Sequence, residues 1–226
     1  MDILTLVISL FTLLFAVTIH EASHGWAALK MGDPTAYSLG RVSLNPIVHL
    51  DLFGSFIVPV FLYFIGEPVF GWAKPVPVNP HNLRNARRDN LWVSLAGPAS
   101  NLAVAFAGLV LIRVLRAGFP RLTVFLRGFL QTGFRLPPGL YPLEGLGLIL
   151  FYLVLINAYL AVFNLIPVPP LDGSGILSGL LSDRAAAAYE SIRPYGFFIV
   201  IALIAVGFLN IIMQPVELFI KVFVFF

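Results

Sequence analysis

Long apolar stretches separated by polar, proline-rich segments are the dominant pattern of this chain. A helix needs about 20 apolar residues to cross the roughly 30 Å hydrocarbon core of a bilayer. The stretches that approach or exceed this length are 3–30, 91–116, 146–166 and 195–213. A further apolar stretch, 52–66, is shorter and is interrupted by Pro59. We therefore expect an all-α membrane protein: a multi-pass bundle of about four spanning helices plus a re-entrant or interfacial hydrophobic segment.

The segments between these helices differ in character. Residues 31–51 contain Asp33-Pro34 and Asn45-Pro46, which favour turns, so we expect a loop or a short β element there. Residues 117–145 carry arginines among Phe and Leu, a pattern typical of an amphipathic segment at the membrane surface. The chain is thus expected to form one membrane-embedded domain, 1–226, with a first helix 3–30, a loop and re-entrant region 31–90, a central helix 91–116, an interfacial segment 117–145, a helix 146–182, and a last helix 195–213 followed by an apolar tail.

The composition agrees with a membrane location. Of the 226 residues, 59% are hydrophobic and 11% are charged, whereas soluble domains carry about 25% charged residues. The mean hydropathy is +0.93. The net charge of +3 favours basic flanks against anionic lipid over nucleic-acid binding. Because the chain has no cysteine, a transition-metal site would have to use His, Asp or Glu side chains.

A cluster of ionisable residues, His20-Glu21-Ala22-Ser23-His24, lies near the end of the first apolar stretch. Positions i and i+4 share one face of a helix, so both imidazoles can bind one metal ion. Glu21 directly follows the first imidazole, where it can act as general base on a water at the metal. Ionisable side chains in a membrane helix cost about 2.5–3.5 kcal/mol each on insertion scales, which indicates that these residues have a function.

A second cluster lies at the end of the stretch 146–166, in the sequence from Asn164 to Gly173 that reads NLIPVPPLDG. Its prolines remove helix donors, and inside a membrane such a break is tolerated only where protein or a cavity covers the backbone. Asp172 presents a carboxylate beyond the break. Two His and one carboxylate would leave a fourth tetrahedral position open, the arrangement of a catalytic zinc. Asn164 could hydrogen-bond the ligands or the substrate backbone.

At these residues the chain resembles the site-2 protease family of intramembrane zinc metalloproteases. HEASH matches the family motif HExxH, NLIPVPPLDG matches its Asn-Pro-Asp-Gly motif, and Ala96-Gly97-Pro98-Ala99-Ser100-Asn101 resembles its GPxxN element. The resemblance implies one zinc ion per chain on His20, His24 and Asp172, with Glu21 as catalytic acid and base. It also implies that transmembrane segments of other proteins, reached within the lipid bilayer, are the substrates. We expect the compact type of this family, without the PDZ-like or nucleotide-sensing appendage of larger relatives.

Other interpretations of the same residues remain open. Asp172 could simply cap a following helix, because Asp is a favoured N-cap residue. Asn164 could serve helix–helix hydrogen bonding, and Asn101 could serve packing rather than contact with substrate. The whole protein could instead be a non-proteolytic membrane protein that binds or transports metal ions, because buried His and Asp near broken helices occur in transporters too. A catalytically silent scaffold is disfavoured by the presence of Glu21.

A shared metal ion also constrains the topology. If His20, His24 and Asp172 meet, their two helices must run parallel, so an odd number of crossings lies between them. The stretch 91–116 supplies one crossing, and we therefore expect 52–66 not to cross. The basic residues then expected at the active-site end are Lys30, Arg41, Lys74, Arg84, Arg87 and Arg88. The positive-inside rule predicts that this end is cytoplasmic and the N-terminus outside, although arginines at 116–135 oppose it.

Overall fold

The computed structural model describes residues 3–65, 72–133, 136 and 139–225. Within these ranges the chain is helical and contains no strand. The α-helices are α1 Ile3–Met31, α2 Thr35–Ser38, α3 Val58–Ile65, α4 Ala86–Gly118, α5 Pro120–Gln131, α6 Pro142–Asn164, α7 Asp172–Leu180, α8 Asp183–Glu190, α9 Gly196–Ala205 and α10 Phe208–Phe225. Short 3₁₀ and π segments lie at Pro46–His49, Phe53–Ile57, Pro80–Asn82 and Arg193–Tyr195.

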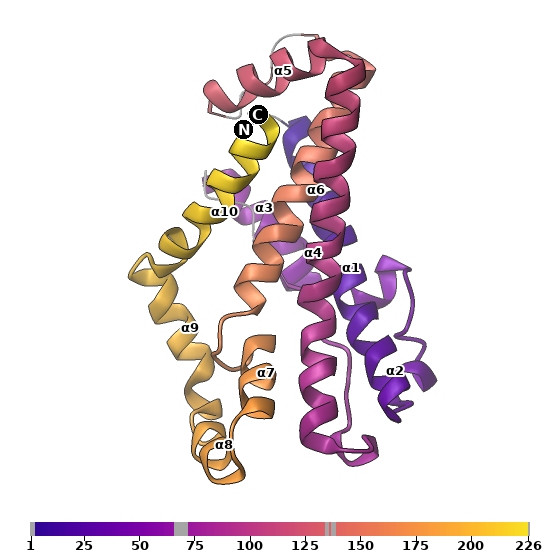
Figure 1. The fold of residues 1–226 in the computed structure, drawn as a ribbon, viewed down its shortest axis with the longest axis vertical. Helices are drawn as coiled ribbons and strands as arrows, with labels where there is room; N and C mark the ends of the chain where they lie inside the picture. Colours follow the sequence, from indigo (N-terminus) through magenta and orange to yellow (C-terminus); the bar gives the residue numbers. More distant parts are fainter. Residues whose placement is uncertain (1–2, 66–71, 134–135, 137–138, 226) are drawn as a thin grey trace.

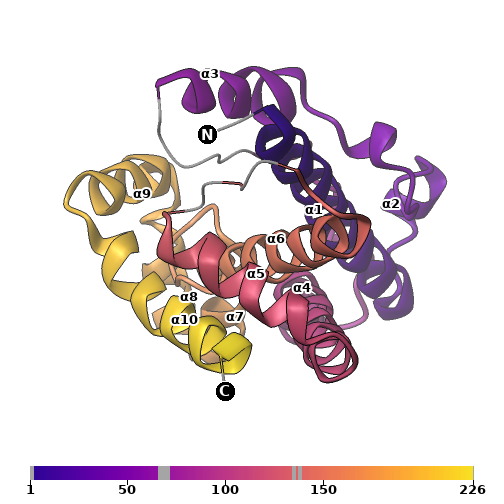
Figure 2. The ribbon, with the colours of Figure 1, turned by 90° about the horizontal axis from the view of Figure 1, so that it is seen from above.

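The centre of the molecule is a bundle of α1, α4 and α6 (Figure 1). In this bundle α4 runs opposite to α1 and α6, so α1 and α6 are parallel. Seen from above, α5 lies across one end of the bundle, and α3 and α9 lie at its periphery (Figure 2). The described helices long and apolar enough to cross a membrane are Ile3–Met31, Ala86–Gly118, Pro142–Asn164 and the combined stretch Asp183–Ala205. The expected all-α, multi-pass architecture is therefore confirmed.

The hydrophobic core joins α5 to α6 at the end away from the histidines. Leu122, Phe129, Leu148 and Phe151 are almost fully buried in this cluster. Helix α5 lies across the end of the bundle and does not run along the bundle axis (Figure 1). Its apolar face packs on α6 and its other face points outward, as in an amphipathic helix at a membrane surface.

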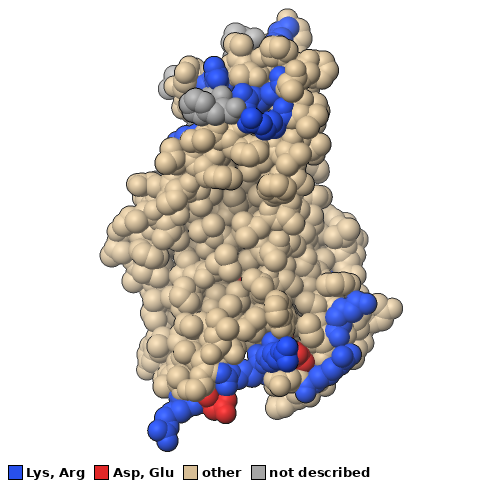
Figure 3. All heavy atoms as spheres, viewed as in Figure 1, with Lys and Arg blue, Asp and Glu red and all other residues tan. Residues whose placement is uncertain are grey.

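Charged side chains gather at the two ends of the face shown in Figure 3, and a broad band between them has none. Such a band matches the hydrocarbon core, where an unpaired charge is costly. The space-filling surface thus agrees with a multi-pass membrane protein.

Two helices expected to be continuous are broken. The stretch 146–182 divides where α6 ends at Asn164 and α7 begins at Asp172, because Pro167, Pro169 and Pro170 cannot continue a helical ladder. A Cβ on Gly173 would lie 2.3 Å from the Leu165 carbonyl oxygen, so only glycine lets α7 pack against this break. The last helix, expected at 195–213, is divided into α9 and α10 at residues 206–207.

The segment from residue 32 to residue 85 begins and ends at the same end of the bundle. The Arg84 amide donates to the Met31 carbonyl at 3.1 Å, which places the start of α4 beside the end of α1. Between these points, 31–51 contains helical turns in place of the β element considered above. Residues 72–79 form an extended stretch that leads back toward α4. It lies beside the earlier part of the same segment, since the Trp72 amide donates to the Gly54 carbonyl. An even number of crossings therefore separates Met31 from Arg84.

Asp33 holds the two ends of this segment together. Its carboxylate accepts hydrogen bonds from Thr35, the Asn79 amide and the Asn82 side chain. Burial by itself would raise the pKa of Asp33, but these hydrogen bonds lower the pKa below its ordinary value. The ionised carboxylate therefore anchors the extended stretch near α1.

This arrangement predicts the sidedness of three exposed positions, which can be tested because the chain has no native cysteine. Single cysteines at Tyr37 and Arg88 should react with a membrane-impermeant maleimide from one side of sealed vesicles. A cysteine at Arg127 should react from the other side, because α4 crosses between Arg88 and Arg127. Labelling of the Tyr37 and Arg88 positions from opposite sides would mean that the segment between them spans the membrane.

Candidate metal centre

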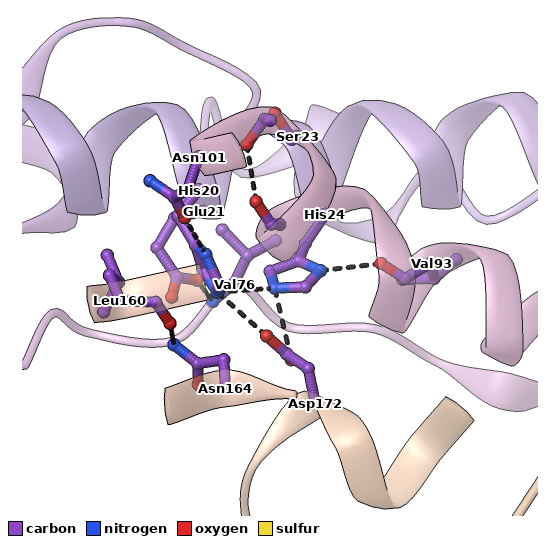
Figure 4. Close-up of polar contacts among 12 residues, drawn as sticks. His20, Glu21, Ser23, His24, Val76, Val93, Asn101, Leu160, Asn164 and Asp172 are labelled. Atoms are coloured by element: carbon purple, nitrogen blue, oxygen red, sulfur yellow. Dashed lines mark hydrogen bonds and ion pairs between the residues drawn. The ribbon is translucent and has the colours of Figure 1, made fainter. Parts of the chain in front are cut away.

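Three side chains from two distant parts of the chain, α1 and the start of α7, converge at one point (Figure 4). His20 and His24 lie one turn apart on α1, with their Nε2 atoms 3.0 Å from each other. Asp172, the first residue of α7, places Oδ2 3.0 Å from His20 Nε2 and Oδ1 3.3 Å from His24 Nε2. The ligand atoms of the three residues all lie within 4.8 Å of one another. The structure thus brings together the three side chains that the sequence singled out.

The tautomer of each imidazole is set by its other nitrogen. His24 Nδ1 lies 2.7 Å from the Val93 carbonyl oxygen, which can only accept, so Nδ1 carries the ring proton. His20 Nδ1 lies 2.6 Å from Asn101 Oδ1, which is likewise an acceptor. Both Nε2 atoms therefore present lone pairs toward Asp172 in the neutral rings.

The orientation of the Asn101 amide is fixed by further partners. Its Nδ2 donates to the Ala16 carbonyl at 3.1 Å and to Asn157 Oδ1 at 2.7 Å, which leaves Oδ1 to face His20. The Asn157 Nδ2 donates in turn to the Leu153 carbonyl. Both asparagines are fully buried. Asn157 was not among the sequence-predicted residues, although an Asn within an apolar span is itself a signal of a polar contact.

The cluster has the chemistry and the spacing of a metal site. Two ring lone pairs and a carboxylate face a common point, and Asp172 Oδ2 is buried without a hydrogen bond among the described residues. In a tetrahedral site with ligand bonds of about 2.0–2.1 Å, neighbouring ligand atoms lie roughly 3.3 Å apart. The observed separations of 3.0, 3.0 and 3.3 Å agree with that spacing. A divalent cation would satisfy all three donors.

Gly97 provides the room beside these rings. A Cβ at this position on α4 would lie 2.4 Å from His24 Nε2 and 2.7 Å from His20 Nε2. Such distances are far shorter than a non-bonded contact, so a glycine is required where α4 passes the cluster. The sequence element around Gly97 and Asn101 thus contributes to the site in two ways: Gly97 lets α4 approach both rings, and Asn101 hydrogen-bonds His20.

Glu21 lies within electrostatic reach of His24, on the side of the cluster occupied by the extended stretch. Its Oε2 accepts a hydrogen bond of 2.7 Å from the Val76 amide. The contact joins residues 55 positions apart, and a backbone donor leaves no mark in the sequence, so only the structure reveals it.

The remaining predicted residues have simpler surroundings. Asn164 is half-buried, and its Nδ2 donates to the Leu160 carbonyl of its own helix at 2.9 Å. The N-cap position of α7 is Leu171, and its side chain makes no capping hydrogen bond. The Asp172 carboxylate therefore points to the histidines rather than to the start of α7.

A multi-pass apolar bundle with a buried His-His-Asp cluster and an adjacent glutamate is the arrangement expected of a membrane-embedded metal-dependent hydrolase. The chain belongs to peptidase family M50, whose model matches residues 8–207, and the resemblance to the site-2 proteases is thereby confirmed. YwhC of Bacillus subtilis (strain 168), a relative named with the words zinc metalloprotease, is 35% identical over 207 residues, 90% of this chain and 83% of that protein. Rip2 of Mycolicibacterium smegmatis, named with the same words, is 30% identical over 198 residues, 87% of this chain and 66% of that protein. No solved structure matches the chain.

The close approach of α4 predicts the effect of a single methyl group. Gly97→Ala should lower metal affinity roughly ten-fold or more, because the added Cβ displaces both rings. Metal content after dialysis against graded chelator measures the change. Gly118→Ala on the same helix is the matched control, since a Cβ there meets no described atom within 4 Å. Equal metal retention in the two variants would contradict the proposed position of the ion.

Proposed function

We propose that the chain is an intramembrane zinc metalloprotease that hydrolyses peptide bonds in transmembrane segments of other membrane proteins. The observation that carries this proposal is the His20, His24 and Asp172 cluster with Glu21 beside it, placed on apolar helices. His20, His24 and Asp172 would hold one Zn²⁺, the metal named in the relatives' descriptions. Three protein ligands leave one position open for chemistry, as in catalytic rather than structural zinc sites.

Zinc, when bound, lowers the pKa of a coordinated water to about 7 and polarises a carbonyl group. Glu21 would accept the proton of the attacking water and later transfer it to the leaving amine. The hydrogen bond from the Val76 amide occupies Oε2 and leaves Oε1 available for this proton. The same bond restricts rotation of the carboxylate, so that the base is held ready for attack.

Asn101 would act through His20 and not through the substrate. Its amide is fully used by His20, Ala16 and Asn157, so it fixes the ring that donates to the metal. Asn164 remains the proposed contact to the substrate carbonyl or to the developing oxyanion, since its side chain is half-buried near the helix break. A substrate helix hides its carbonyls in its own hydrogen bonds, so it must unwind locally before attack.

The active site would open toward the cytoplasm. More of the basic residues lie at the end of the bundle that holds the extended stretch and the start of α4 than at the end covered by α5. Cytoplasmic loops carry an excess of Lys and Arg, and this bias supports the orientation.

The proposal predicts that Glu21→Gln retains zinc and loses proteolysis. Glutamine keeps the shape of the side chain and its hydrogen bond to the Val76 amide, but it cannot accept a proton. A drop of at least about 100-fold in cleavage of a model transmembrane substrate is expected, the usual contribution of a general base. Zinc analysis of the same preparation is the control. Equal cleavage by the two proteins would exclude Glu21 as the base, and transport of metal without cleavage would favour the metal-transport alternative.

Removal of each ligand should lower zinc content. His20→Ala, His24→Ala and Asp172→Ala each delete one of three donors, and bound zinc should fall well below one per chain after dialysis. Asp183→Ala, an exposed acid of α8 paired with Arg87, is the matched control and should keep zinc. Full occupancy in Asp172→Ala would show that the carboxylate is not a ligand.

A further inference from the structure

A pocket of about 440 Å³ lies beside the extended stretch 72–79, which passes the candidate metal centre. Its lining residues are Leu39, Arg41, Val48, Lys74, Pro75 and Pro77. The wall is therefore apolar except for two cationic side chains. Among the described residues, neither cation forms an ion pair with an acid.

Arg41 is an unusual wall residue because it is buried, with 9% of its surface exposed. Its Nη2 donates to the Lys74 carbonyl at 2.7 Å and to the Pro75 carbonyl at 3.3 Å. Its Nε is buried and has no partner among the described atoms. Carbonyl dipoles solvate a guanidinium only partly, and a buried charge without a counter-ion is unfavourable. Because Arg41 lines the pocket, an anion held there would lie beside this charge.

One peptide group connects this pocket to the catalytic carboxylate. The Pro75 carbonyl accepts from Arg41, and the Val76 amide of the same peptide donates to Glu21. Cation and carboxylate thus lie at opposite edges of a single peptide group. The Val76 side chain is buried toward α1 at Gly25, whereas Pro75 and Pro77 face the pocket.

We propose that this pocket binds an acidic side chain of the substrate polypeptide, a few residues from the scissile bond. The inference rests on the proposed proteolytic function. The apolar wall suits the methylene groups of Glu, and Arg41 with Lys74 suits its carboxylate. The nearness of Glu21 favours a substrate group over a lipid headgroup, because a peptide extended through the active site advances about 3.3–3.6 Å per residue and reaches the pocket within a few residues.

The pocket is held ready before any ligand arrives. The Lys74 amide donates to the His49 carbonyl at 2.9 Å, and the Asn79 amide donates to Asp33 at 2.7 Å. With Arg41 bonded to two carbonyls between these anchors, little ordering remains for a substrate to induce. Binding of a carboxylate would therefore be expressed mainly in KM.

The test uses the full chain with zinc in an uncharged detergent and a neutral model transmembrane substrate. A single Glu is moved through the positions that flank the cleavage site, and each substrate is compared with its Gln counterpart. At one or two positions, wild-type protein should cleave the Glu form with a kcat/KM about ten-fold higher, carried by KM, as expected for a charge-assisted hydrogen bond. The Glu21→Gln variant should bind the same Glu peptide more tightly than the Gln peptide.

Charge reversal identifies the pocket. Lys74 is exposed, so Lys74→Glu should fold normally, abolish the preference for Glu and favour a Lys at the same substrate position. Arg41→Lys should retain part of the preference, and Arg41→Gln should lose it. Arg88→Glu makes the same change in net charge on an exposed residue outside the pocket and should leave the preference intact.

Each outcome bears on one claim. Cleavage without any preference for Glu would contradict the proposed role of the pocket. A preference that Lys74→Glu and Arg88→Glu change equally would contradict it as well. Neither result would affect the proposed proteolytic function. Retention of phosphatidylglycerol by wild type but not by Lys74→Glu, with no preference for Glu, would assign the pocket to a lipid phosphate. Absence of cleavage of all substrates by zinc-loaded wild type would overturn the proposed function on which the inference rests.

Discussion

The structure depends on the convergence of two imidazole lone pairs and one carboxylate inside an apolar bundle. In each neutral ring Nδ1 carries the proton, because it faces an acceptor: the Asn101 amide oxygen for His20 and the Val93 carbonyl for His24. Each Nε2 therefore presents a lone pair. Without a cation the arrangement is a cluster of repelling dipoles in a medium that screens weakly. The bundle forces the three residues together, and a metal cation or a proton shared with Asp172 would offset their repulsion.

The bundle meets this demand through the direction of its helices. Parallel α1 and α6 bring the end of α6 toward the second half of α1, and the break after Asn164 then directs Asp172 to the histidines. A continuous helix would continue along the bundle axis instead of turning back to the cluster. The prolines that break the helix, and Gly173 that packs against the break, therefore help to shape the candidate metal site although they supply no ligand atom.

Much of this could be predicted from the sequence, and the physical reason is periodicity. The spacing of His20 and His24 puts them on one helix face. A metal ion shared with Asp172 requires the two ligand-bearing helices to be parallel, which predicts an odd number of membrane crossings between them. The partners that hold these groups were not predictable in the same way. Val93 and Val76 act through backbone atoms, which every residue possesses, so their roles follow only from the fold. Asn157 could be recognised as a polar residue in an apolar span, but its partner, Asn101, follows only from the packing of α6 against α4.

The peptide between Pro75 and Val76 shows how such backbone contacts can carry chemistry. A peptide group that accepts from a guanidinium and donates to a carboxylate is polarised in one direction by both partners, and each bond strengthens the other. Glu21 is therefore held by an amide whose donor strength depends on a charge on the far side of the extended stretch. The proposed carboxylate pocket and the proposed general base thus share one peptide group, and no helix lies between them.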